Sequence, residues 1–473
     1  MTSAAIFDLD RTLLRGGSGP VLQHALREEG LGPQQDVPGL GALFGLFEVI
    51  GETYPSMLVA KRAVSMTKGW PVDAVDRAAA AAAPELFAKV LPYAKQVIEQ
   101  HRGEGRKLVL ATTTPEHLVR PLAELLNFDA VVASKHAQLN GEFLGELDGD
   151  FVWGRAKARA VKRWLKDQGI SLRSSYAYSD SYYDVPLLAR VGHPVAVNPD
   201  IRLEALARLR GWEVRWFDVP PGVAKLGGQI EAQKLALSLS VPELLPFAKL
   251  EFTGVEKIPA KGAAVLVANH RSYFDATAVA MLAGKSGRVV RFLGKKEVFD
   301  APFVGDLAKA FGGIRVDRGT GSGAPLEAAE RALEAGELIV MMPQGTIPRG
   351  PAFFDPELKA RLGAARLAGA AGVPVVPVGL WGTEQVWPRS ARFPNLNPLQ
   401  RPTVQIKVGD PFMISGDDPD TDTKAIMAAI SAQLPAEAAV QREPSEAELR
   451  ATFPPGYKGD PTAEVDRRPG SDT

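Results

Sequence analysis

The sequence contains no cysteine among its 473 residues. This absence excludes disulfide bonds, thiolate metal sites and cysteine nucleophiles together. Any covalent catalysis therefore needs a different nucleophile, and the composition fits a reducing compartment.

An excess of either charge is also missing. Lysine and arginine together number 55, and aspartate and glutamate together number 55. No global positive field attracts nucleic acid, so we expect no nucleic-acid partner, although local basic patches remain open.

Long hydrophobic runs are missing as well. No stretch of eighteen apolar residues occurs, which predicts that no helix spans a membrane. The N-terminal segment places Asp8 and Asp10 where a signal peptide carries a positive and then an apolar region. We therefore expect the protein to be made and kept in the cytoplasm.

The composition that is present, 45% hydrophobic and 23% charged residues, is typical of a soluble globular protein. A chain of this length exceeds one ordinary hydrophobic core, which predicts two or three domains.

The first half of the chain alternates apolar segments with helical patterns. Apolar segments that predict buried strands lie at residues 4–7, 107–112, 130–133, 175–179, 194–198 and 212–217. Apolar positions three and four apart predict helices at residues 21–29, 40–68, 72–83, 84–101 and 116–126. This alternation predicts an α/β fold with a parallel, doubly wound sheet.

Two carboxylates follow the first predicted strand. Asp8 and Asp10 are two residues apart, so in an extended segment their side chains point to the same face. Convergent carboxylates repel each other unless a positive group lies between them, and their hard oxygen atoms suit a divalent cation. The alternative is that both acids cap the following turn.

Other polar residues follow the later strands. Thr112 ends the second strand, and Asp180 and Asp184 follow the fourth. Ligands of doubly wound sheets bind beyond the carboxyl ends of the strands, so these side chains are expected near Asp8 and Asp10. Taken singly, the threonine has an alternative role as a helix cap.

These residues carry a resemblance to a known family. Asp8-x-Asp10-x-Thr12, Thr112, Lys157 and Asp180-x-x-x-Asp184 resemble, in this order, the four motifs of the haloacid dehalogenase-like phosphatases. The helical insertion after the first motif is similar to the cap of their phosphoserine-phosphatase-like branch. The resemblance covers residues 1–217, with the cap at about residues 15–102.

The resemblance implies roles for the motif residues. Asp8 would be the nucleophile that forms an aspartyl-phosphate, and Asp10 the general acid and base. Thr112 and Lys157 would hold the phosphoryl oxygens, although a lysine in a helix is ordinarily a solvated surface charge. The implied ligands of a magnesium ion are Asp8, the backbone carbonyl of Asp10, Asp180 and Asp184. Arg11 stands where many relatives carry glycine, which leaves the substrate open.

Residues 218–248 form a predicted linker. A Pro-Pro-Gly cluster at residues 220–222 ends the first half, and residues 229–240 predict an amphipathic helix. This helix either packs between domains or touches a membrane surface, for which its positive charge is modest.

The second half opens with a histidine and an aspartate at a strand end. Residues 263–268 predict a buried strand that leads into Asn269 and His270, and Asp275 follows after four intervening residues. A neighbouring carboxylate fixes the tautomer of a histidine that acts as a general base. Chance supplies such a pair easily, so the segments downstream decide its meaning.

Three further segments follow. Residues 311–319 place glycines before a short strand flanked by Arg315 and Arg318, which predicts either a solvated turn or a phosphate site. A buried strand at residues 338–342 leads into the Pro-Gln-Gly-Thr loop at residues 343–346, a plausible ligand-binding turn. Residues 372–378 predict a strand whose prolines suit an edge or first-residue position.

Together the four segments resemble the glycerolipid acyltransferases, the family that includes 1-acylglycerol-3-phosphate acyltransferase. Asn269-His270-x-x-x-x-Asp275 is similar to the catalytic motif of that family. The later segments resemble its phosphate-binding block, its Pro-Glu-Gly-Thr block and its apolar fourth block. The resemblance covers about residues 249–415 and predicts an α/β acyltransferase domain at residues 249–435.

By resemblance, His270 deprotonates the acceptor hydroxyl, Asp275 orients the histidine, and the hydroxyl attacks an acyl thioester such as acyl-CoA. Arg318 and Arg315 would bind the phosphate of a lysophospholipid acceptor. No serine or cysteine acyl-enzyme is required.

The third block departs from the family. Gln344 replaces the usual glutamate, which leaves the identity of the acceptor open. Gly345 and Thr346 complete the block as implied substrate contacts, and Arg349 is a candidate to compensate in phosphate binding.

The sequence therefore predicts a bifunctional enzyme of lipid metabolism that associates peripherally with the inner face of the membrane. The acyltransferase would make phosphatidic acid, and the phosphatase would act on a phosphomonoester, with the lipid itself as one candidate. The alternatives are a non-catalytic, regulatory phosphatase-like domain or a different acyl acceptor. Residues 436–473, rich in proline and charge, predict a disordered or surface-laid tail.

Overall fold

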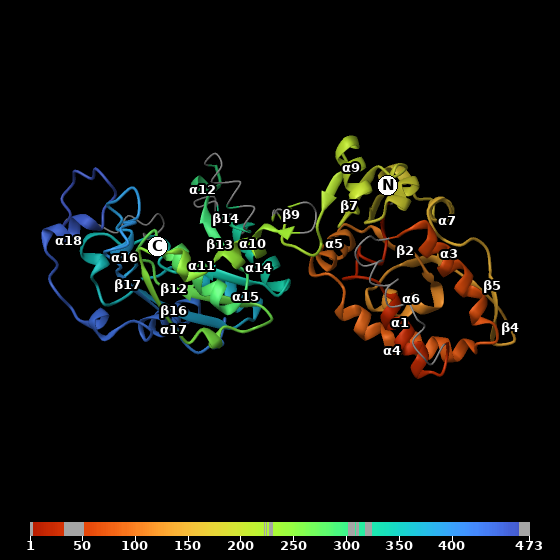
Figure 1. Ribbon diagram of the computed structural model, residues 1–473, viewed down its shortest axis with the longest axis horizontal. Helices are drawn as coiled ribbons and strands as arrows, with labels where there is room; N and C mark the ends of the chain where they lie inside the picture. Colours follow the sequence, from red (N-terminus) through yellow and green to blue (C-terminus); the bar gives the residue numbers. More distant parts are fainter. Residues whose placement is uncertain are drawn as a thin grey trace. The chain divides into compact units, whose positions relative to one another are not determined.

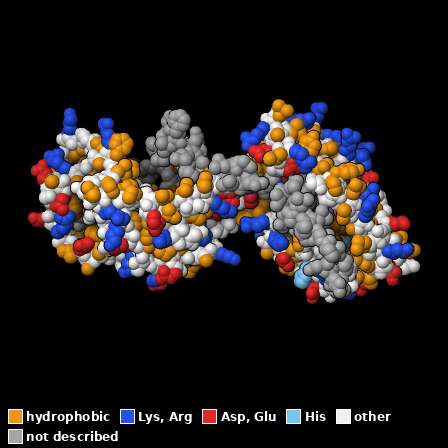
Figure 2. All heavy atoms as spheres, in the orientation of Figure 1, with side chains coloured by type: hydrophobic (Ala, Val, Ile, Leu, Met, Phe, Trp, Pro, Cys, Tyr) orange, Lys and Arg blue, Asp and Glu red, His pale blue; other side chains and the backbone are white. Residues whose placement is uncertain are grey.

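The computed structural model divides the chain into two units, Met1–Pro221 and Gly222–Thr473, each with its own sheet (Figure 1). The structure describes residues 3–32, 52–221, 223, 225–226, 230–300, 308, 312–316 and 324–462. Basic, acidic and hydrophobic side chains are interspersed over the visible face of both units (Figure 2), in keeping with the balanced charge.

The first unit is built on a six-stranded sheet with the order β3-β2-β1-β6-β7-β8. Its strands are β1 Ala4–Phe7, β2 Lys107–Pro115, β3 Ala130–Ser134, β6 Tyr176–Ser179, β7 His193–Val197 and β8 Glu213–Arg215. All neighbouring strands pair in parallel, which confirms the predicted doubly wound sheet. The strand order reverses at β1, so ligands are expected beyond the end of that strand.

The two faces of this sheet are covered by different helices. Ala4 and Ile6 of β1 belong to the core that contains α7 Arg155–Asp167, α8 Val185–Leu188 and α9 Ile201–Arg210. Phe7 faces the opposite side, where its ring contacts His101 of α5 Pro92–Gly103. The alternation follows from the two-residue period of a strand.

A helical cap follows β1. Its described elements are α1 Gly19–Glu28, α3 Tyr54–Ala63, the 3-10 helix Val64–Thr67 and α4 Val72–Ala88, while part of the predicted helix at residues 40–68 lies outside the described residues. The predicted helix boundary at Pro84 is wrong, because α4 continues through this proline. A proline removes one backbone hydrogen bond, and here the alanines before it and the fully buried Leu86 after it maintain the helix.

One hairpin was not predicted from the sequence. Strands β4 His136–Leu139 and β5 Glu142–Leu147 pair antiparallel. Asn140 and Gly141 join them with φ of 53° and 84°. Two positive φ values suit the Asn-Gly turn of a tight hairpin, which is a strong sequence signal.

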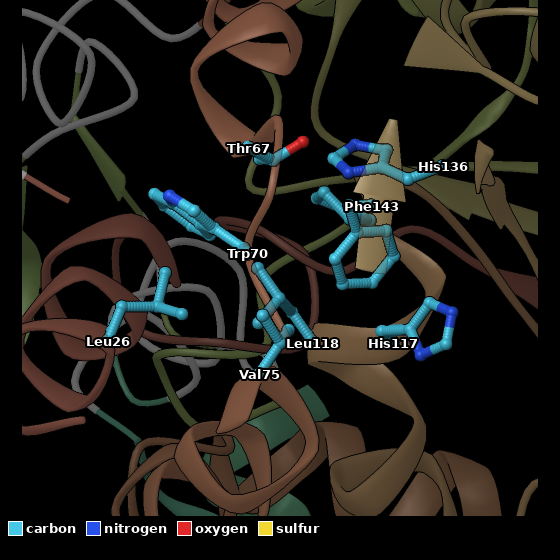
Figure 3. Close-up of a pocket in the computed structure, with 9 residues that line it drawn as sticks. Leu26, Thr67, Trp70, Val75, His117, Leu118, His136 and Phe143 are labelled. Carbon is cyan, nitrogen blue, oxygen red and sulfur yellow. The ribbon is translucent and has the colours of Figure 1, made fainter. Parts of the chain in front are cut away.

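The hairpin extends the cap. Phe143 exchanges backbone hydrogen bonds with Gly69 and Trp70, and its buried ring contacts the rings of His117 and His136. Figure 3 shows these rings around a small, mainly apolar pocket, with His117 contributed by α6 Glu116–Leu125. This pocket is part of the packing between cap and hairpin.

The second unit is built on a seven-stranded sheet with the order β11-β17-β16-β12-β15-β13-β14. The strands are β11 Lys249–Thr253, β12 Ala264–Ala268, β13 Val290–Lys295, β14 Ile314–Val316, β15 Leu338–Met341, β16 Val375–Trp381 and β17 Thr403–Val408. All pairs are parallel except β16 with β17. The predicted α/β class is confirmed, with a mixed sheet.

Helices cover both faces of this sheet as well. The core on one face contains α11 Asp275–Ser286, against which the linker helix α10 Ala232–Leu239 packs. The core on the other contains α14 Ala324–Glu334, α15 Gly363–Ala371 and α17 Pro419–Ser431. The remaining short elements are β9 Lys225–Leu226, β10 Ile230–Glu231, α12 Lys296–Asp300 and α16 Thr383–Val386. None of the described helices combines the length and apolarity needed to cross a bilayer.

The predicted edge position of the proline-containing strand is wrong, because β16 lies between β12 and β17. Pro374 precedes the strand, but Pro377 lies within it. The antiparallel register changes around Pro377, since Val375 pairs with Phe412 whereas Val378 pairs with Val408. The missing N–H of Pro377 therefore falls where the ladder is already irregular.

The tail is ordered over much of its length. The 3-10 helix Ala436–Ala439 and α18 Glu446–Ala451 lie within the described residues. Thr452 accepts a hydrogen bond from the N–H of Gly350 at 2.7 Å, and Phe453 is buried. Residues up to Thr462 are thus laid on the second unit, and residues 463–473 lie outside the described part.

Candidate active sites

The first site lies directly beyond β1, where Asp8 meets a lysine from α7. The Nζ atom of Lys157 lies 2.8 Å from Oδ1 of Asp8 and 2.7 Å from Oδ2 of Asp184. Lys157 is fully buried. Burial alone would lower its pKa, but the carboxylates of Asp184, Asp8 and Glu52 together raise the pKa well above its ordinary value. This lysine is a fixed buried cation, not a solvated surface charge.

The hydroxyl of Thr12 links Asp8 to Asp180. Its Oγ1 lies 3.3 Å from Oδ2 of Asp8 and 3.3 Å from Oδ1 of Asp180, and it accepts the N–H of Asp180 at 3.0 Å. One hydroxyl proton serves only one carboxylate at a time. Thr12 therefore brings two carboxylates from different strands close together without neutralising both.

The negative charge of this site exceeds its positive charge. Burial raises the pKa of Asp8 to about 7, despite the opposing attraction of Lys157. Burial also raises the pKa of Asp180, against the attraction of Arg11. Buried carboxylates with raised pKa values and hard oxygen donors fit a divalent cation. No three His, Asp or Glu side chains form a metal-binding group in the described part of the chain, so such an ion also needs backbone oxygen.

Asp10 connects the site to the start of the cap. Its Oδ1 accepts the N–H of Ser18, the residue before α1, at 2.5 Å. Its Oδ2 lies 3.5 Å from the hydroxyl of Thr114, and burial raises its pKa. Thr112 is buried and accepts the N–H of Thr114 at 3.2 Å. Thr112 is thus connected to Asp10 through one intervening residue, Thr114.

The backbone at Arg11 adopts a conformation that is unusual for a residue with a side chain. Arg11 has a φ of 59°, a left-handed conformation that glycine adopts most easily. Its Nε lies 3.2 Å from Oδ2 of Asp180. The guanidinium therefore pairs with a carboxylate of the site.

Sequence reasoning missed Glu52, which the cap contributes to this site. Its Oε2 accepts hydrogen bonds from the hydroxyl of Ser181 at 2.7 Å and the indole N–H of Trp153 at 3.1 Å. Burial raises the pKa of Glu52, and Lys157 opposes this. No motif marks this residue, because its partners are more than one hundred residues away.

The second site lies beyond β12. The Nδ1 atom of His270 lies 2.7 Å from Oδ2 of Asp275, the first residue of α11. The same oxygen accepts the N–H groups of Arg271 at 2.6 Å and Ser272 at 2.9 Å. Asp275 is fully buried. Its carboxylate is therefore held rigidly and in turn fixes the imidazole.

Two amide side chains hold the segment that carries the histidine. Asn269 bonds through its amide to both the N–H and the C=O of Leu380 in the neighbouring strand β16, at 2.7 and 2.8 Å. Gln344, buried in the loop after β15, accepts the N–H of His270 through Oε1 at 2.6 Å. A carboxylate can accept this bond equally, so the exchange of glutamate for glutamine preserves the contact.

Arg271 is enclosed beside the histidine. It pairs with both carboxylate oxygens of Glu384 at 3.0 and 3.2 Å, and its guanidinium stacks over the rings of Phe353 and Trp381. Because this cation is already paired and stacked, it supports the segment structurally.

The cations predicted to bind phosphate have different surroundings. Arg315 is exposed and pairs with Asp300 at 2.9 Å. Arg318 lies outside the described residues. Arg349 and Thr346 are half-buried in the loop after β15.

A further arginine lies against this loop. Gly345 has a φ of 70°, and a side chain there would lie 3.2 Å from Nε and Cδ of Arg361. Arg361 is half-buried, and its guanidinium forms no ion pair or hydrogen bond within the described part of the chain. Arg361 thus lies against Gly345, the residue that follows Gln344, and Gln344 itself contacts His270. Sequence reasoning missed it because no motif includes it.

Comparisons with known proteins agree with this geometry. Residues 5–189 match the family described as haloacid dehalogenase-like hydrolase, and residues 249–381 match the family described as acyltransferase. The phosphoserine phosphatase SerB1 of Mycobacterium tuberculosis is 32% identical over 230 residues, which cover 48% of this chain and 75% of that protein. The chain belongs to the haloacid dehalogenase-like hydrolases. This hydrolase also carries an acyltransferase domain, and it is an enzyme with two candidate active sites.

Two further similarities concern the separate halves of this haloacid dehalogenase-like hydrolase. The histidinol-phosphatase of Neisseria meningitidis is 25% identical over 221 residues, covering 46% of this chain and all of that protein. The crystal structure of the 1-acyl-sn-glycerophosphate acyltransferase of Thermotoga maritima is 21% identical and covers 42% of this chain and 77% of that one, with a TM-score of 0.32.

Proposed function

We propose that the second site transfers an acyl group from an acyl thioester such as acyl-CoA to the hydroxyl of a phosphate-bearing lysolipid, giving phosphatidic acid from 1-acylglycerol-3-phosphate. The observation that carries this proposal is the bond between His270 and Asp275. The carboxylate already accepts two backbone N–H groups, and it accepts a third hydrogen bond from the Nδ1–H of the imidazole. The proton stays on Nδ1. The Nε2 atom then carries the lone pair that removes the proton of the acceptor hydroxyl. As the oxygen bonds to the acyl carbon, the C–S bond of the thioester breaks, and the imidazolium returns the proton to the leaving thiolate.

The phosphate of the acceptor is the second element of this proposal. Arginine guanidinium groups bind phosphate oxygens through paired N–H donors. Arg361 has no charged partner among the described residues and lies against the loop that contacts the His270 segment. We assign it to the acceptor's phosphate together with the predicted residues Arg315, Arg318 and Arg349.

Consumption of acyl-CoA across a panel of acceptors tests this function. The panel contains 1-acylglycerol-3-phosphate, its dephosphorylated counterpart and alcohols without a glycerol backbone, and His270→Ala is the control. Transfer to the phosphate-bearing acceptor that His270→Ala abolishes supports the proposal. Efficient transfer only to alcohols without phosphate would overturn it.

We propose that the first site hydrolyses a phosphomonoester with Asp8 as the nucleophile. Asp10 donates a proton to the leaving oxygen and later takes one from water, while Lys157 and Thr112 bind phosphoryl oxygens. A magnesium ion held by Asp8, Asp180 and the carbonyl of Asp10, with Asp184 nearby, would neutralise charge on the phosphoryl group. The buried carboxylates around Thr12 support this assignment.

The substrate of the phosphatase has two candidates. One is the product or acceptor of the acyltransferase, which would couple the sites in series and give neutral glycerides. Glu52 favours the other, a phosphate ester of an amino alcohol, because its carboxylate in the cap suits an ammonium group. Two similar proteins bear the names phosphoserine phosphatase and histidinol-phosphatase, whose substrates are such esters.

Release of inorganic phosphate distinguishes the two candidates. The panel contains phosphatidic acid, lysophosphatidic acid, phosphoserine and histidinol phosphate, with Asp8→Asn as the control that abolishes hydrolysis and spares acyl transfer. Glu52→Gln should raise KM for the amino-alcohol esters only. Release from none of them would leave the first domain as a regulatory module.

A further inference from the structure

The loop between α16 and β17, residues 388–402, exposes an apolar cluster. Phe393 is 77% exposed, Leu396 60% and Leu399 91%. Single exposed apolar side chains are ordinary, but three large ones within seven residues concentrate apolar surface on one loop, as interaction sites do.

The same loop is basic. It contains no aspartate or glutamate between Pro388 and Pro402. Arg392 and Arg401 flank the apolar cluster, are exposed, and form no ion pair within the described part of the chain. An apolar cluster flanked by unpaired cations complements a surface with an apolar interior and negative head groups.

The loop is fixed beside the histidine of the second site. The carbonyl of Trp387, directly before the loop, accepts a hydrogen bond from the hydroxyl of Ser272 at 2.6 Å. The ring of Trp387 meets that of Tyr273, whose side chain is 43% exposed, edge to face at 5.6 Å. Asn395 donates its N–H to the carbonyl of Val386 at 2.8 Å. The loop is therefore anchored to the chain segment that carries His270.

Internal hydrogen bonds preorganise the loop. Asn395 accepts the N–H of Asn397 at 3.1 Å, and Asn397 accepts the N–H of Leu399 at 3.0 Å. The indole N–H of Trp387 donates to the carbonyl of Ala391 at 3.2 Å. These turns hold the apolar side chains outward, so binding a partner requires little ordering of the loop.

The linker is a weaker candidate for the same role. Leu244 is 58% exposed, but Leu245 and Phe247 pack against the core of the second unit. Glu243 adds a negative charge next to the exposed leucine. Leu235 and Leu239 of the linker helix are exposed as well, but Lys234, which precedes them, is paired with Glu231 at 2.6 Å and is not available to anionic head groups.

We propose that residues 388–402 dock the second unit on an anionic lipid bilayer. Phe393, Leu396 and Leu399 enter the boundary between head groups and acyl chains, and Arg392 and Arg401 contact the head-group phosphates. Docking here presents the His270 segment to acceptors that reside in the bilayer. This inference rests on the proposed lipid acceptor for its purpose, although binding itself requires no catalysis.

Vesicle co-sedimentation of the full-length protein tests this inference. The vesicles contain phosphatidylcholine alone or an equimolar mixture with phosphatidylglycerol. The triple variant Phe393→Ser, Leu396→Ser, Leu399→Ser should lose about tenfold or more of its partitioning into the mixed vesicles. The double variant Arg392→Gln, Arg401→Gln should remove the preference for the anionic mixture and its sensitivity to salt.

A matched control lies in the first unit. Leu139, Ile201 and Leu209 are 60%, 79% and 83% exposed, so their triple serine variant removes a similar exposed apolar area. Equal loss of binding in this control, or unchanged binding of the loop variant, would overturn the inference. Binding of the wild-type loop to a soluble protein, lost in the triple variant, without binding to vesicles would overturn it too.

A second measurement separates docking from catalysis. Acyl transfer to a short-chain acceptor below its critical micelle concentration should be the same in the wild type and the triple loop variant. Loss of that activity would show that the loop forms part of the acyl-transfer site. If the wild type has no such activity but binds vesicles through the loop, the proposed acyl transfer fails while the docking surface stands.

Discussion

Oδ2 of Asp275 receives three donors at once: Nδ1 of His270 at 2.7 Å and the N–H groups of Arg271 and Ser272 at 2.6 and 2.9 Å. The four-residue spacing between histidine and aspartate is what permits this. It lets the chain after β12 turn back so that the carboxylate at the start of α11 reaches Nδ1 of the imidazole. Four residues between His270 and Asp275 are therefore what this turn needs to bring all three donors to one carboxylate oxygen.

Asp275→Asn tests the charge of this carboxylate. An amide oxygen can still accept from the two backbone groups, so the fold should persist while the negative charge that stabilises the imidazolium is lost. We expect kcat for acyl transfer to fall by about 10²–10⁴-fold. Phosphate release by the first site is the internal control and should not change.

Gln344 makes a contrasting prediction. Gln344→Glu keeps an oxygen for the N–H of His270 and should retain acyl transfer within a few-fold and with the same acceptor preference. Gln344→Ala leaves the N–H of His270 without its partner and should lower the free energy of unfolding by about 1–3 kcal/mol. Initial rates with several acceptors measure the first effect, and urea unfolding measures the second. A change of acceptor in Gln344→Glu would show that the side chain contacts substrate directly.

Arg361→Gln tests the assigned phosphate contact. We expect KM for a phosphate-bearing acceptor to rise about tenfold or more, because a charge-assisted contact is worth roughly 1.5–3 kcal/mol. KM for the acceptor without phosphate should stay unchanged. Arg366→Gln is the matched control, since Arg366 lies on α15, is exposed and has no charged partner within the described part of the chain. Equal effects of both variants would contradict the assignment.

Thr12→Val probes the link between the two carboxylates of the first site. The variant keeps the shape of the side chain but leaves the buried N–H of Asp180 unpaired and removes the shared proton. We expect phosphate release to fall at least about tenfold, and Thr12→Ser to restore most of it. Acyl transfer by the same preparation should stay unchanged. Full hydrolysis by Thr12→Val would show that other contacts position Asp8 and Asp180.

Much of the fold follows from the sequence for a simple reason. Buried parallel strands are continuous apolar runs, so β1, β2, β6 and β12 are visible without further context. Polar residues at their carboxyl ends then converge because the strands are parallel. The hairpin at Asn140-Gly141 was also predictable, since this dipeptide is a turn signal. The interior position of β16 was not, because its proline falls at an irregularity that only pairing reveals.

The contacts within the sites could be predicted less well. Resemblance named Lys157, but only the fold buries it between Asp8 and Asp184. The bond from His270 to Gln344 spans 74 residues, and Arg361 is outside every motif. Such contacts depend on which loops the sheet brings together, and a local pattern carries no information about that.

His101 supplies a prediction about stability and pH. It is buried on α5, its Nε2 lies 2.7 Å from the hydroxyl of Tyr178, and its Nδ1 lies 3.0 Å from a guanidinium nitrogen of Arg106. A guanidinium only donates, so Nδ1 accepts and the imidazole is neutral. Burial, reinforced by Arg106, lowers the pKa of His101 to about 4.

The sign of the effect follows from proton linkage. The unfolded chain binds a proton at this histidine below its ordinary pKa of 6.5, whereas the folded chain does so only near 4. The contribution of His101 to stability is therefore complete above pH 6.5 and lost as the pH falls towards 4, in total about 2 kcal/mol for a partly screened group. Urea unfolding at several pH values in this window, compared with His101→Gln, isolates the effect. His24→Gln, a histidine-to-glutamine change on the exposed side of α1, is the surface control for the substitution itself. An identical pH dependence in His101→Gln would show that the pKa of His101 does not change on folding.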